Sequence, residues 1–463
     1  MKKIPLLAVT YLLSIFYTSC KAPNSDKVSD TSDERPNIIF IFADDWGYGD
    51  LGSHGNTYIK TPNLDKMIAG GIDFQNFSVS NPVCSPSRTA VMTGHFPARH
   101  SVHGHFASAE SHVKRKMPDW LNPKAPMLPR MLKEAGYATA HFGKWHLSNT
   151  HIKDAPSPLA YGYDEFDCFN LSSQFKQMHP DSTIFKTIDF IERHKEKPFF
   201  ANVWIHATHT PHYPKERFLK QYSHLDEPRQ VYASVVSEAD YRIGLLFEKL
   251  KDLGIDQNTL IVFSSDNGPE ITGSQKIIPD ASTGEGLGTL YSVGETGGLK
   301  GRKRSLFAGG VRTPFVVNWP EVSPSGKVDK ITSLASTDLL PTFVELAHAQ
   351  LPVGYVPDGE SFAKAIKGKP FKRKKPVFWQ WKFASDKTNF WPTSAIQEDN
   401  WKLLLNQETG HKELYNIAED WPEQNNLALK YPEKVNTLID KIIKWELTLP
   451  KSPPENCFSE FRK

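Results

Sequence analysis

Residues 84–94 (CSPSRTAVMTG) combine a cysteine and an arginine with the signals of a short helix. Pro86 is typical of a first helical turn and Gly94 of a C-terminal cap, so a helix is predicted to begin at Cys84. The free N–H groups and dipole of a helix N-terminus favour an anion. Arg88 follows one turn later on the same face and could fork onto two anionic oxygens. A capped surface helix with a chance cysteine explains these features equally well.

Two further segments carry candidate oxygen ligands. Asp44, Asp45 and Asp266 supply carboxylates, and Asn267 supplies an amide oxygen. Hard oxygen ligands without imidazole or thiolate suit calcium, or magnesium, better than zinc. Each segment alone is also typical of a turn, because Asp and Asn-Gly commonly end strands.

The elements that must position these residues are strands and helices in alternation. Apolar runs that suit strands buried on both faces lie at 37–43, 198–205, 259–264 and 314–319. Helical patterns lie between them, at 129–135, 187–194 and 231–250. This order predicts an α/β fold, with a large, mostly parallel sheet flanked by helices. Ligand-binding residues of such sheets lie just beyond the carboxyl ends of strands, which is where the sequence places Asp44, Asp45, His206, Asp266 and Asn267.

A second, smaller domain is expected after the basic stretch 363–376, which is best interpreted as a helix end and linker. Short strands are predicted at 377–381, 394–397 and 402–405, and a helix at 432–447. The prediction is therefore a main domain over 36–375 and an antiparallel sheet with one helix over 376–463. Its aromatic residues would suit either core packing or sugar stacking: Trp379, Trp381, Phe383, Phe390, Trp391 and Trp401.

The cysteine segment resembles a known signature. Cys-x-Pro-Ser-Arg at 84–88, closed by Thr-Gly at 93–94, is similar to the motif of type I sulfatases of the alkaline phosphatase superfamily. Other blocks of that family occur in the family's order, at 37–52 (NIIFIFADDWGYGDLG), 143–146 (GKWH), 211–214 (PHYP), 265–268 (SDNG) and 303–314 (KRSLFAGGVRTP). The resemblance covers nearly the whole mature chain and extends to bacterial lipoprotein polysaccharide sulfatases.

The resemblance implies a nucleophile and a metal site. Cys84 would be oxidised by a maturing enzyme to formylglycine, whose hydrate offers one hydroxyl for attack and a second for release of sulfate. One calcium ion would be bound by the modified Cys84 together with Asp44, Asp45, Asp266 and Asn267.

The same resemblance implies roles for the surrounding cations and histidines. Arg88 and Lys144 would hold the charged sulfate, and His146 would handle the remaining hydroxyl. His212 and Lys303 would serve the leaving oxygen, His212 because it stands in Pro-His-x-Pro. His206 and His209 are interpreted as loop histidines that could face the substrate. The family commonly has an acidic residue where this chain has Ala308, five positions after Lys303.

The expected function is hydrolysis of sulfuric esters on a glycan, such as a glycosaminoglycan oligosaccharide, ulvan or carrageenan. One alternative is a phosphonate or phosphodiester hydrolase, since relatives on this fold share the formylglycine motif. Another is a glycan-binding lipoprotein without activity.

Composition limits the partners and the location. Lys plus Arg (55) nearly balances Asp plus Glu (52) in the 463 residues, so a broad nucleic-acid-binding face is not expected. Residues 1–20 are similar to a bacterial lipoprotein signal, in which Cys20 receives the lipid, and polar residues 21–35 would form a tether. The chain is therefore expected to be exported and anchored to a membrane, facing the periplasm or the cell surface.

Two sets of residues remain open in the sequence. The chain has four cysteines, and the sequence does not say whether Cys168 and Cys457 pair. A group of histidines follows the cysteine helix and could form a second metal site, although a pocket rim or surface loop is favoured: His95, His100, His103 and His105.

Overall fold

A computed structural model describes Met1 and residues 35–270, 292–382 and 392–462. The signal and lipid site expected at 1–20 and nearly all of the tether at 21–35 lie outside the described residues, as do the aromatic residues Phe383, Phe390 and Trp391. All that follows concerns the compact unit that begins at Arg35.

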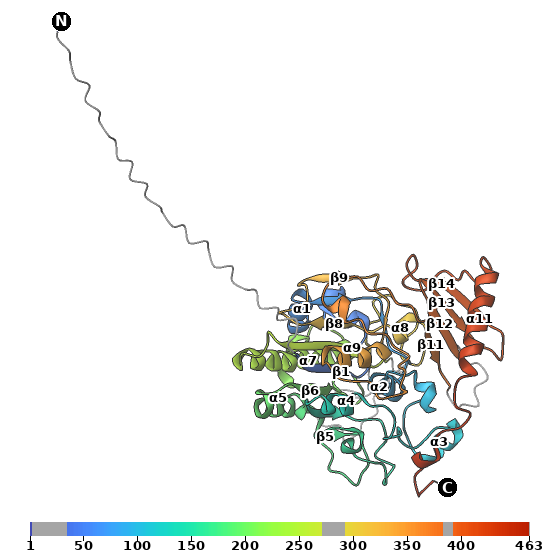
Figure 1. Ribbon diagram of the computed structural model, residues 1–463, viewed down its shortest axis with the longest axis horizontal. Helices are drawn as coiled ribbons and strands as arrows, with labels where there is room; N and C mark the ends of the chain where they lie inside the picture. The colour runs from blue at the N-terminus through green and yellow to red at the C-terminus, as the bar shows by residue number, and fades with distance from the viewer. Residues whose placement is uncertain (2–34, 271–291, 383–391, 463) are drawn as a thin grey trace. The chain divides into compact units, whose positions relative to one another are not determined.

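An eight-stranded sheet forms the centre of this unit (Figure 1), with the strand order β5-β4-β6-β1-β7-β8-β2-β9. The strands are β1 (Asn37–Ala43), β2 (Ile72–Phe74), β4 (Ala138–Lys144), β5 (Glu165–Phe169), β6 (Phe199–Trp204), β7 (Thr259–Ser265), β8 (Phe315–Asn318) and β9 (Lys327–Asp329). Those from β5 to β7 run parallel, whereas β8 is antiparallel to both of its neighbours. The predicted mixed, mostly parallel sheet is confirmed.

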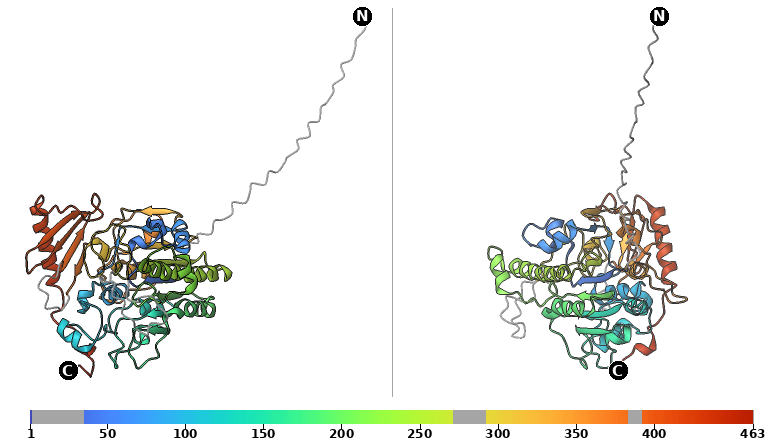
Figure 2. Two further views of the ribbon diagram at one scale, coloured as in Figure 1. Left: turned by 180° about the vertical axis from the view of Figure 1, so that it is seen from behind. Right: turned by 60° about the vertical axis from the view of Figure 1, so that its left-hand side comes forward.

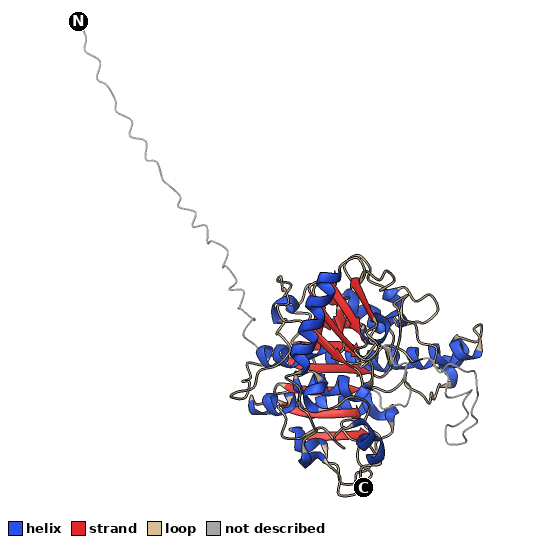
Figure 3. Ribbon diagram, turned by 90° about the vertical axis from the view of Figure 1, so that its right-hand side faces the viewer, coloured by secondary structure: helices blue, strands red, loops and turns tan. Residues whose placement is uncertain are grey.

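Each face of the sheet is covered by helices because both faces of its central strands are apolar (Figure 3). In β1, Phe40 and Phe42 join one hydrophobic core, and Ile39 and Ile41 join another on the opposite face. The first core contains α2 (Cys84–Thr93), α4 (Leu128–Glu134) and α9 (Leu339–Leu346). The second contains α1 (Pro62–Ala69), α5 (Thr183–His194) and α7 (Glu227–Asp252).

The remaining elements are short or belong to the C-terminal layer. A two-stranded sheet joins β3 (Phe77–Ser78) to β10 (Leu334–Ala335), and short helices include α3 (Ala109–Arg115), α6 (Glu216–Gln221), α8 (Ala308–Val311) and α10 (Ala363–Ile366). The C-terminal layer is an antiparallel sheet of β11 (Val377–Gln380), β12 (Ser394–Glu398), β13 (Trp401–Leu405) and β14 (Lys412–Asn416), with α11 (Pro432–Glu446) against one face. This confirms the predicted small sheet with one helix. Trp379 and Trp381 are fully buried in the main core, so core packing is their role.

The C-terminal segment leaves α11 and returns to the main part of the molecule. It ends beside α3 (Figures 1 and 2), where the N–H of Asp119 donates to the Cys457 carbonyl over 2.8 Å. The last residues therefore pack on the main part of the molecule. The residues on the two sides of the boundary expected near residue 376 belong to one compact unit. Across the described residues, every helix is too short or too polar to span a bilayer.

Candidate active site

The nucleophile segment forms the helix that the sequence predicts. Helix α2 starts at Cys84 and ends at Gly94, which adopts the left-handed conformation. All ten residues of α2 are buried, and Cys84 is only 4% exposed. Burial raises the pKa of the Cys84 thiol to about 11, against an opposing effect of Lys144. The unmodified side chain is therefore a neutral thiol and a poor nucleophile.

The four predicted oxygen ligands meet at one edge of the sheet. Strands β1 and β7 are parallel neighbours, so Asp44 and Asp45 lie beside Asp266 and Asn267. The Asn267 amide donates to Asp45 over 2.7 Å, and the backbone N–H of Asp45 donates to Asp266 over 3.2 Å. Gly268 completes the turn because a Cβ there would lie 1.8 Å from the Gly309 carbonyl oxygen.

Each carboxylate of this group faces a cationic side chain. Arg88 donates to Asp266 through Nε at 3.1 Å and a terminal nitrogen at 2.6 Å. Lys144, the last residue of β4, lies 2.6 Å from Asp44. Lys303 lies 2.5 Å from Asp45 and 3.2 Å from Glu270. The structure thus brings three predicted cations onto three predicted ligands.

Burial and mutual repulsion shift the carboxylates in different directions. Burial, followed by the charge of Asp44, raises the pKa of Asp266 to about 7. Burial also raises the pKa of Asp45, against the effect of Lys303. Burial alone would raise the pKa of Asp44, but Lys144 and His209 lower it well below its usual value. Of the three carboxylates, Asp44 is therefore the one held most firmly in its charged form.

The donor set fits a divalent cation. The ligand atoms of Asp44, Cys84 and Asp266 lie within 4.8 Å of one another, and all three residues are buried. Among the described residues, Asp44 Oδ1 and Asn267 Oδ1 are buried oxygens without a hydrogen-bond partner. Both oxygens of Asp45 accept from other side chains, Lys303 and Asn267. Buried, unpartnered, hard oxygens are what a calcium or magnesium ion binds.

A cavity of about 550 Å³ opens above this group. It is lined by the expected residues Cys84, Lys144, His146 and Lys303. Other lining side chains include His105, Asn149, His206, His209 and Arg304. Its volume far exceeds a sulfate-sized group, so the leaving portion of a substrate can also be accommodated.

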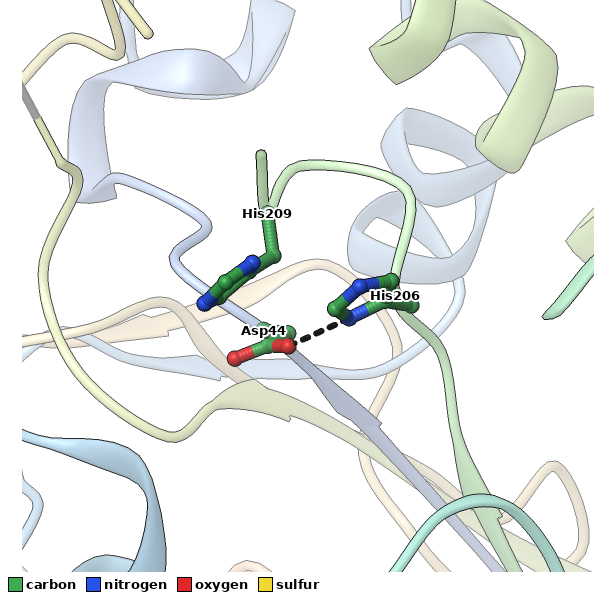
Figure 4. Close-up of side chains that lie close together, drawn as sticks. All are labelled: Asp44, His206 and His209. Atoms are coloured by element: carbon green, nitrogen blue, oxygen red, sulfur yellow. Dashed lines mark hydrogen bonds and ion pairs between the residues drawn. The ribbon is translucent and has the colours of Figure 1, made fainter. Parts of the chain in front are cut away.

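Two histidines that follow β6, His206 and His209, lie beside the carboxylate group (Figure 4). His206 donates from Nδ1 to Asp44 over 2.6 Å, and the His209 ring stacks on it with centroids 4.8 Å apart. His209 Nε2 lies 3.9 Å from Asp45. His212 is instead 1% exposed against Tyr232 and is not among the residues that line the cavity.

The role that the Pro-His-x-Pro pattern assigns to His212 therefore stays a prediction. The signal for the other two histidines is their position, because His206 and His209 follow the carboxyl end of β6 by two and five residues. Both lie close to a predicted ligand, His206 at 2.6 Å from Asp44 and His209 at 3.9 Å from Asp45.

His146 is held in one orientation by the backbone. Its Nε2 lies 3.0 Å from the Phe106 carbonyl, which can only accept, so Nε2 carries the proton. Burial, followed by the charge of Lys144, lowers the pKa of His146 well below its usual value, so the ring is neutral. Nδ1 is then an acceptor, and among the described residues it has no hydrogen-bond partner.

The structure places the two cysteines and the four histidines whose roles the sequence left open. Cys168 and Cys457 are free and do not pair. Of the four histidines after α2, His105 lines the cavity, which supports a pocket rim. His95 and His100 lie 3.3 Å apart by their ring nitrogens, but none of the four belongs to a metal-ligand group of three or more side chains within the described part of the chain.

Known proteins share this arrangement of sequence and fold. The sulfatase family model matches residues 36–349, and the model described as N-sulphoglucosamine sulphohydrolase, C-terminal, matches residues 295–448. The chain belongs to the sulfatase family. The sulfatase is accordingly a hydrolase of sulfuric esters, and the family generally uses formylglycine and a metal ion.

Relatives of the sulfatase cover most of its length. It is 30% identical to N-acetylgalactosamine-6-sulfatase of Canis lupus familiaris, over 75% of this chain and 68% of that protein. It is 26% identical to N-acetylgalactosamine-6-O-sulfatase of Bacteroides thetaiotaomicron, over 87% of each. Among solved structures, Ps i-CgsB in complex with k-i-k-neocarrahexaose matches with a TM-score of 0.75 and 26% identity, over 92% of this chain and 96% of that one.

Proposed function

We propose that the sulfatase removes sulfate from a sulfated saccharide, using formylglycine made from Cys84 and one bound calcium ion. Two kinds of relative support the substrate class, the N-acetylgalactosamine-6-sulfatases and a structure that holds a neocarrahexaose. The observation that carries the proposal is the convergence of Cys84, three carboxylates and three cations in one buried cluster, from which Cys84, Lys144 and Lys303 line a cavity.

The charge balance of this floor supports a bound cation and an anionic substrate. Asp44, Asp45 and Asp266 are matched one to one by Lys144, Lys303 and Arg88. A divalent cation held by Asp44, Asp45, Asp266, Asn267 and the modified Cys84 would leave two surplus positive charges. A sulfate monoester, which carries one negative charge, would offset part of that surplus. When bound, the calcium ion supplies Lewis acidity to a sulfate oxygen, and formylglycine supplies the nucleophilic hydroxyl.

The chain's own side chains would then bind the sulfate and move its protons. Arg88 and Lys144 hold sulfate oxygens in fixed orientation. His146, neutral with a free Nδ1, accepts a proton from a hydroxyl at position 84. Burial alone would lower the pKa of Lys303, but Asp45 raises it, so Lys303 keeps its proton and stabilises charge on the leaving oxygen. His212 is the predicted partner of that oxygen, and His209, which lines the cavity, is a second candidate for the same role.

Mass spectrometry and kinetics test this proposal together. Peptides that contain position 84 from the native host should carry the aldehyde, and that protein should hydrolyse sulfated saccharides. Cys84→Ala should lose activity while keeping the fold. Sulfated N-acetylgalactosamine oligosaccharides, neocarra-oligosaccharides, nitrophenyl sulfate and a nitrophenyl phosphodiester form the substrate panel. An unmodified thiol in active enzyme, or preference for the phosphodiester, would overturn the proposal.

The location and the second partner are also part of this proposal. Cys20 would be lipidated after export, which places the enzyme on a membrane surface where extracellular polymers can reach it. A formylglycine-generating or anaerobic sulfatase-maturing enzyme would act on Cys84. Saccharide binding that persists in Cys84→Ser, with no turnover by the parent, would instead indicate a binding lipoprotein.

A further inference from the structure

Phe106 connects the nucleophile helix to the histidine that faces it. Its backbone N–H donates to the Ser85 hydroxyl over 3.0 Å, directly beside Cys84. Its carbonyl accepts from His146 over 3.0 Å and from Asn149 over 3.1 Å. Because this carbonyl dictates which nitrogen of His146 bears the proton, its position decides whether Nδ1 is an acceptor in the cavity.

A buried His–Asp pair holds the backbone next to this carbonyl. The N–H of Ala107 lies 2.6 Å from His112 Nε2 and can only donate, so Nε2 is unprotonated and Nδ1 carries the proton. Nδ1 then donates to Asp119 over 2.7 Å. His112 and Asp119 are both fully buried, and the His112 ring meets the Phe106 ring edge-on at 5.6 Å. Neither of the pair lines the catalytic cavity.

The C-terminal segment braces the same pair from behind. The N–H of Ser459 donates to the second carboxylate oxygen of Asp119 over 2.8 Å, and the Cys457 carbonyl accepts from the Asp119 backbone. Arg462 adds an ion pair at 3.6 Å. One carboxylate oxygen of Asp119 therefore binds His112, and the other binds residues 457–462.

We propose that His112 and Asp119, braced by residues 457–462, are positioning residues that fix the Phe106 carbonyl and through it the proton and orientation of His146. The chain of contacts runs from Asp119 to His112, to the Ala107 N–H, to the adjoining Phe106 carbonyl and to His146. The role given to His146 rests on the proposed function, whereas its orientation rests on these contacts alone.

Three variants of the full chain test the inference when kcat and KM are measured separately for each of them. His112→Leu removes the acceptor for the Ala107 N–H, and kcat per folded enzyme should fall at least ~10-fold with KM unchanged, because His146 shifts while the substrate contacts stay. His112→Gln keeps an acceptor atom near the Nε2 position and should restore most of kcat.

His54→Leu is the matched control, because His54 is an equally buried histidine, bonded to Asp73 at 3.0 Å and to the Tyr48 carbonyl at 2.8 Å, away from the cavity lining. It should lower stability and leave kcat per folded enzyme near that of the parent. Unchanged kcat in His112→Leu, a loss in His112→Gln as large as that in His112→Leu, or a change confined to KM would overturn the inference.

A second measurement keeps this test independent of sulfate turnover. Nitrogen NMR of histidine-labelled protein, with His146→Asn to assign the signal, should show His146 protonated on Nε2 in the parent and a mixture of tautomers in His112→Leu. The same tautomer in both proteins would overturn the inference even if the parent hydrolysed no sulfate ester. A parent with the expected tautomer but no activity would overturn the proposed function instead.

Discussion

At the scale of single residues, the site is a set of buried opposite charges. The ion pair between Arg88 and Asp266 has no solvent-exposed side-chain surface. Such pairs gain their stability from geometry and from complete hydrogen bonding, since the desolvation cost is large. The two contacts from Arg88 to one carboxylate oxygen therefore matter more than its charge alone.

Arg88→Lys should lower kcat/KM for a sulfate ester about 100-fold, because a lysine keeps the charge and loses the planar fork that makes two contacts with Asp266. Arg99→Lys is the control, since Arg99 makes a similar contact with Asp358 at 2.7 Å near the surface. Steady-state kinetics of both variants would decide the matter. Retention of activity within about threefold of the parent in Arg88→Lys would contradict the role of the fork.

Calcium should stabilise the enzyme more at alkaline than at acidic pH. The pKa of Asp266 is raised to about 7 without a metal, so its contribution to stability is greatest below the unfolded value near 3.8 and is lost as the pH rises toward 7. Bound calcium would stabilise the ionised Asp266 and so offset this loss of stability. The rise in thermal midpoint on adding calcium should therefore be larger at about pH 8 than at about pH 5.5.

Differential scanning fluorimetry with calcium and with a chelator measures this effect. Asp44→Asn, which removes a ligand charge, should reduce the midpoint shift at both pH values. An equal calcium effect at the two pH values would show that Asp266 is not part of the cation site.

At the scale of elements, the site depends on strands that end together and on turns that have no room for side chains. Strands β1 and β7 place their last residues side by side, and the turn after β7 brings Gly268 against the backbone of α8. The proposed cation site would thus be assembled from neighbouring strand ends, in agreement with the general rule for open parallel sheets.

Gly268→Ala should lower the free energy of unfolding by about 1–3 kcal/mol, because the new Cβ would lie 1.8 Å from the Gly309 carbonyl oxygen and the backbone would have to shift. Gly104→Ala is a suitable control, since the nearest atom to its Cβ would be an ordinary 3.4 Å away. Urea denaturation compares the two. A smaller loss in Gly268→Ala than in Gly104→Ala would contradict the packing argument.

The sequence predicted the fold class because its buried strands are apolar on both faces and its helices are amphipathic. It did not reveal β14 (Lys412–Asn416), whose exposed start and mixed polarity hide the strand pattern. Strand β4 was missed as well, since Thr139 and His141 interrupt the apolar run although both are buried. Long, uniform patterns were readable, and short or polar buried segments were not.

The site was predictable where a residue has a fixed place in a local motif, and less so where loops fold back. Lys144 and Lys303 lie far apart in the sequence, and only the family resemblance suggested that they meet. The position of His206 and His209 beside the carboxylates depended on the path of a loop, which no periodicity reveals. The contacts of Asp119 with His112 and with residues 457–462 had no sequence signal at all.

At the scale of the whole molecule, hydrogen bonds join the main part to the C-terminal layer at several places. Trp379 donates from its indole nitrogen to the Val79 carbonyl over 2.7 Å, shortly before α2, and the last residues return to Asp119. The nucleophile helix is therefore enclosed by both parts of the chain. Loss of the C-terminal layer should therefore expose the segment that leads into α2.

The proposed anchor predicts where the enzyme is found. Cys20→Ser should move the protein from the membrane fraction to the soluble extracytoplasmic fraction, because the only attachment proposed is the lipid on that cysteine. Fractionation and immunoblotting of the native host measure this. Turnover of nitrophenyl sulfate should be the same in both forms. Membrane retention of Cys20→Ser would contradict the anchor.

The burial of Cys84 limits when the cysteine can be oxidised. All ten residues of α2 are buried once the fold is complete, and Cys84 meets solvent only through the cavity, whereas an oxidising enzyme must take the peptide around position 84 into its own active site. Under the proposed function, conversion therefore has to happen on the nascent or unfolded chain, before export. A chain that folds first keeps its thiol permanently. Specific activity then depends on the rate of Cys84 oxidation relative to the rate of folding. Faster synthesis with the same amount of maturing enzyme should yield more protein and less activity per molecule.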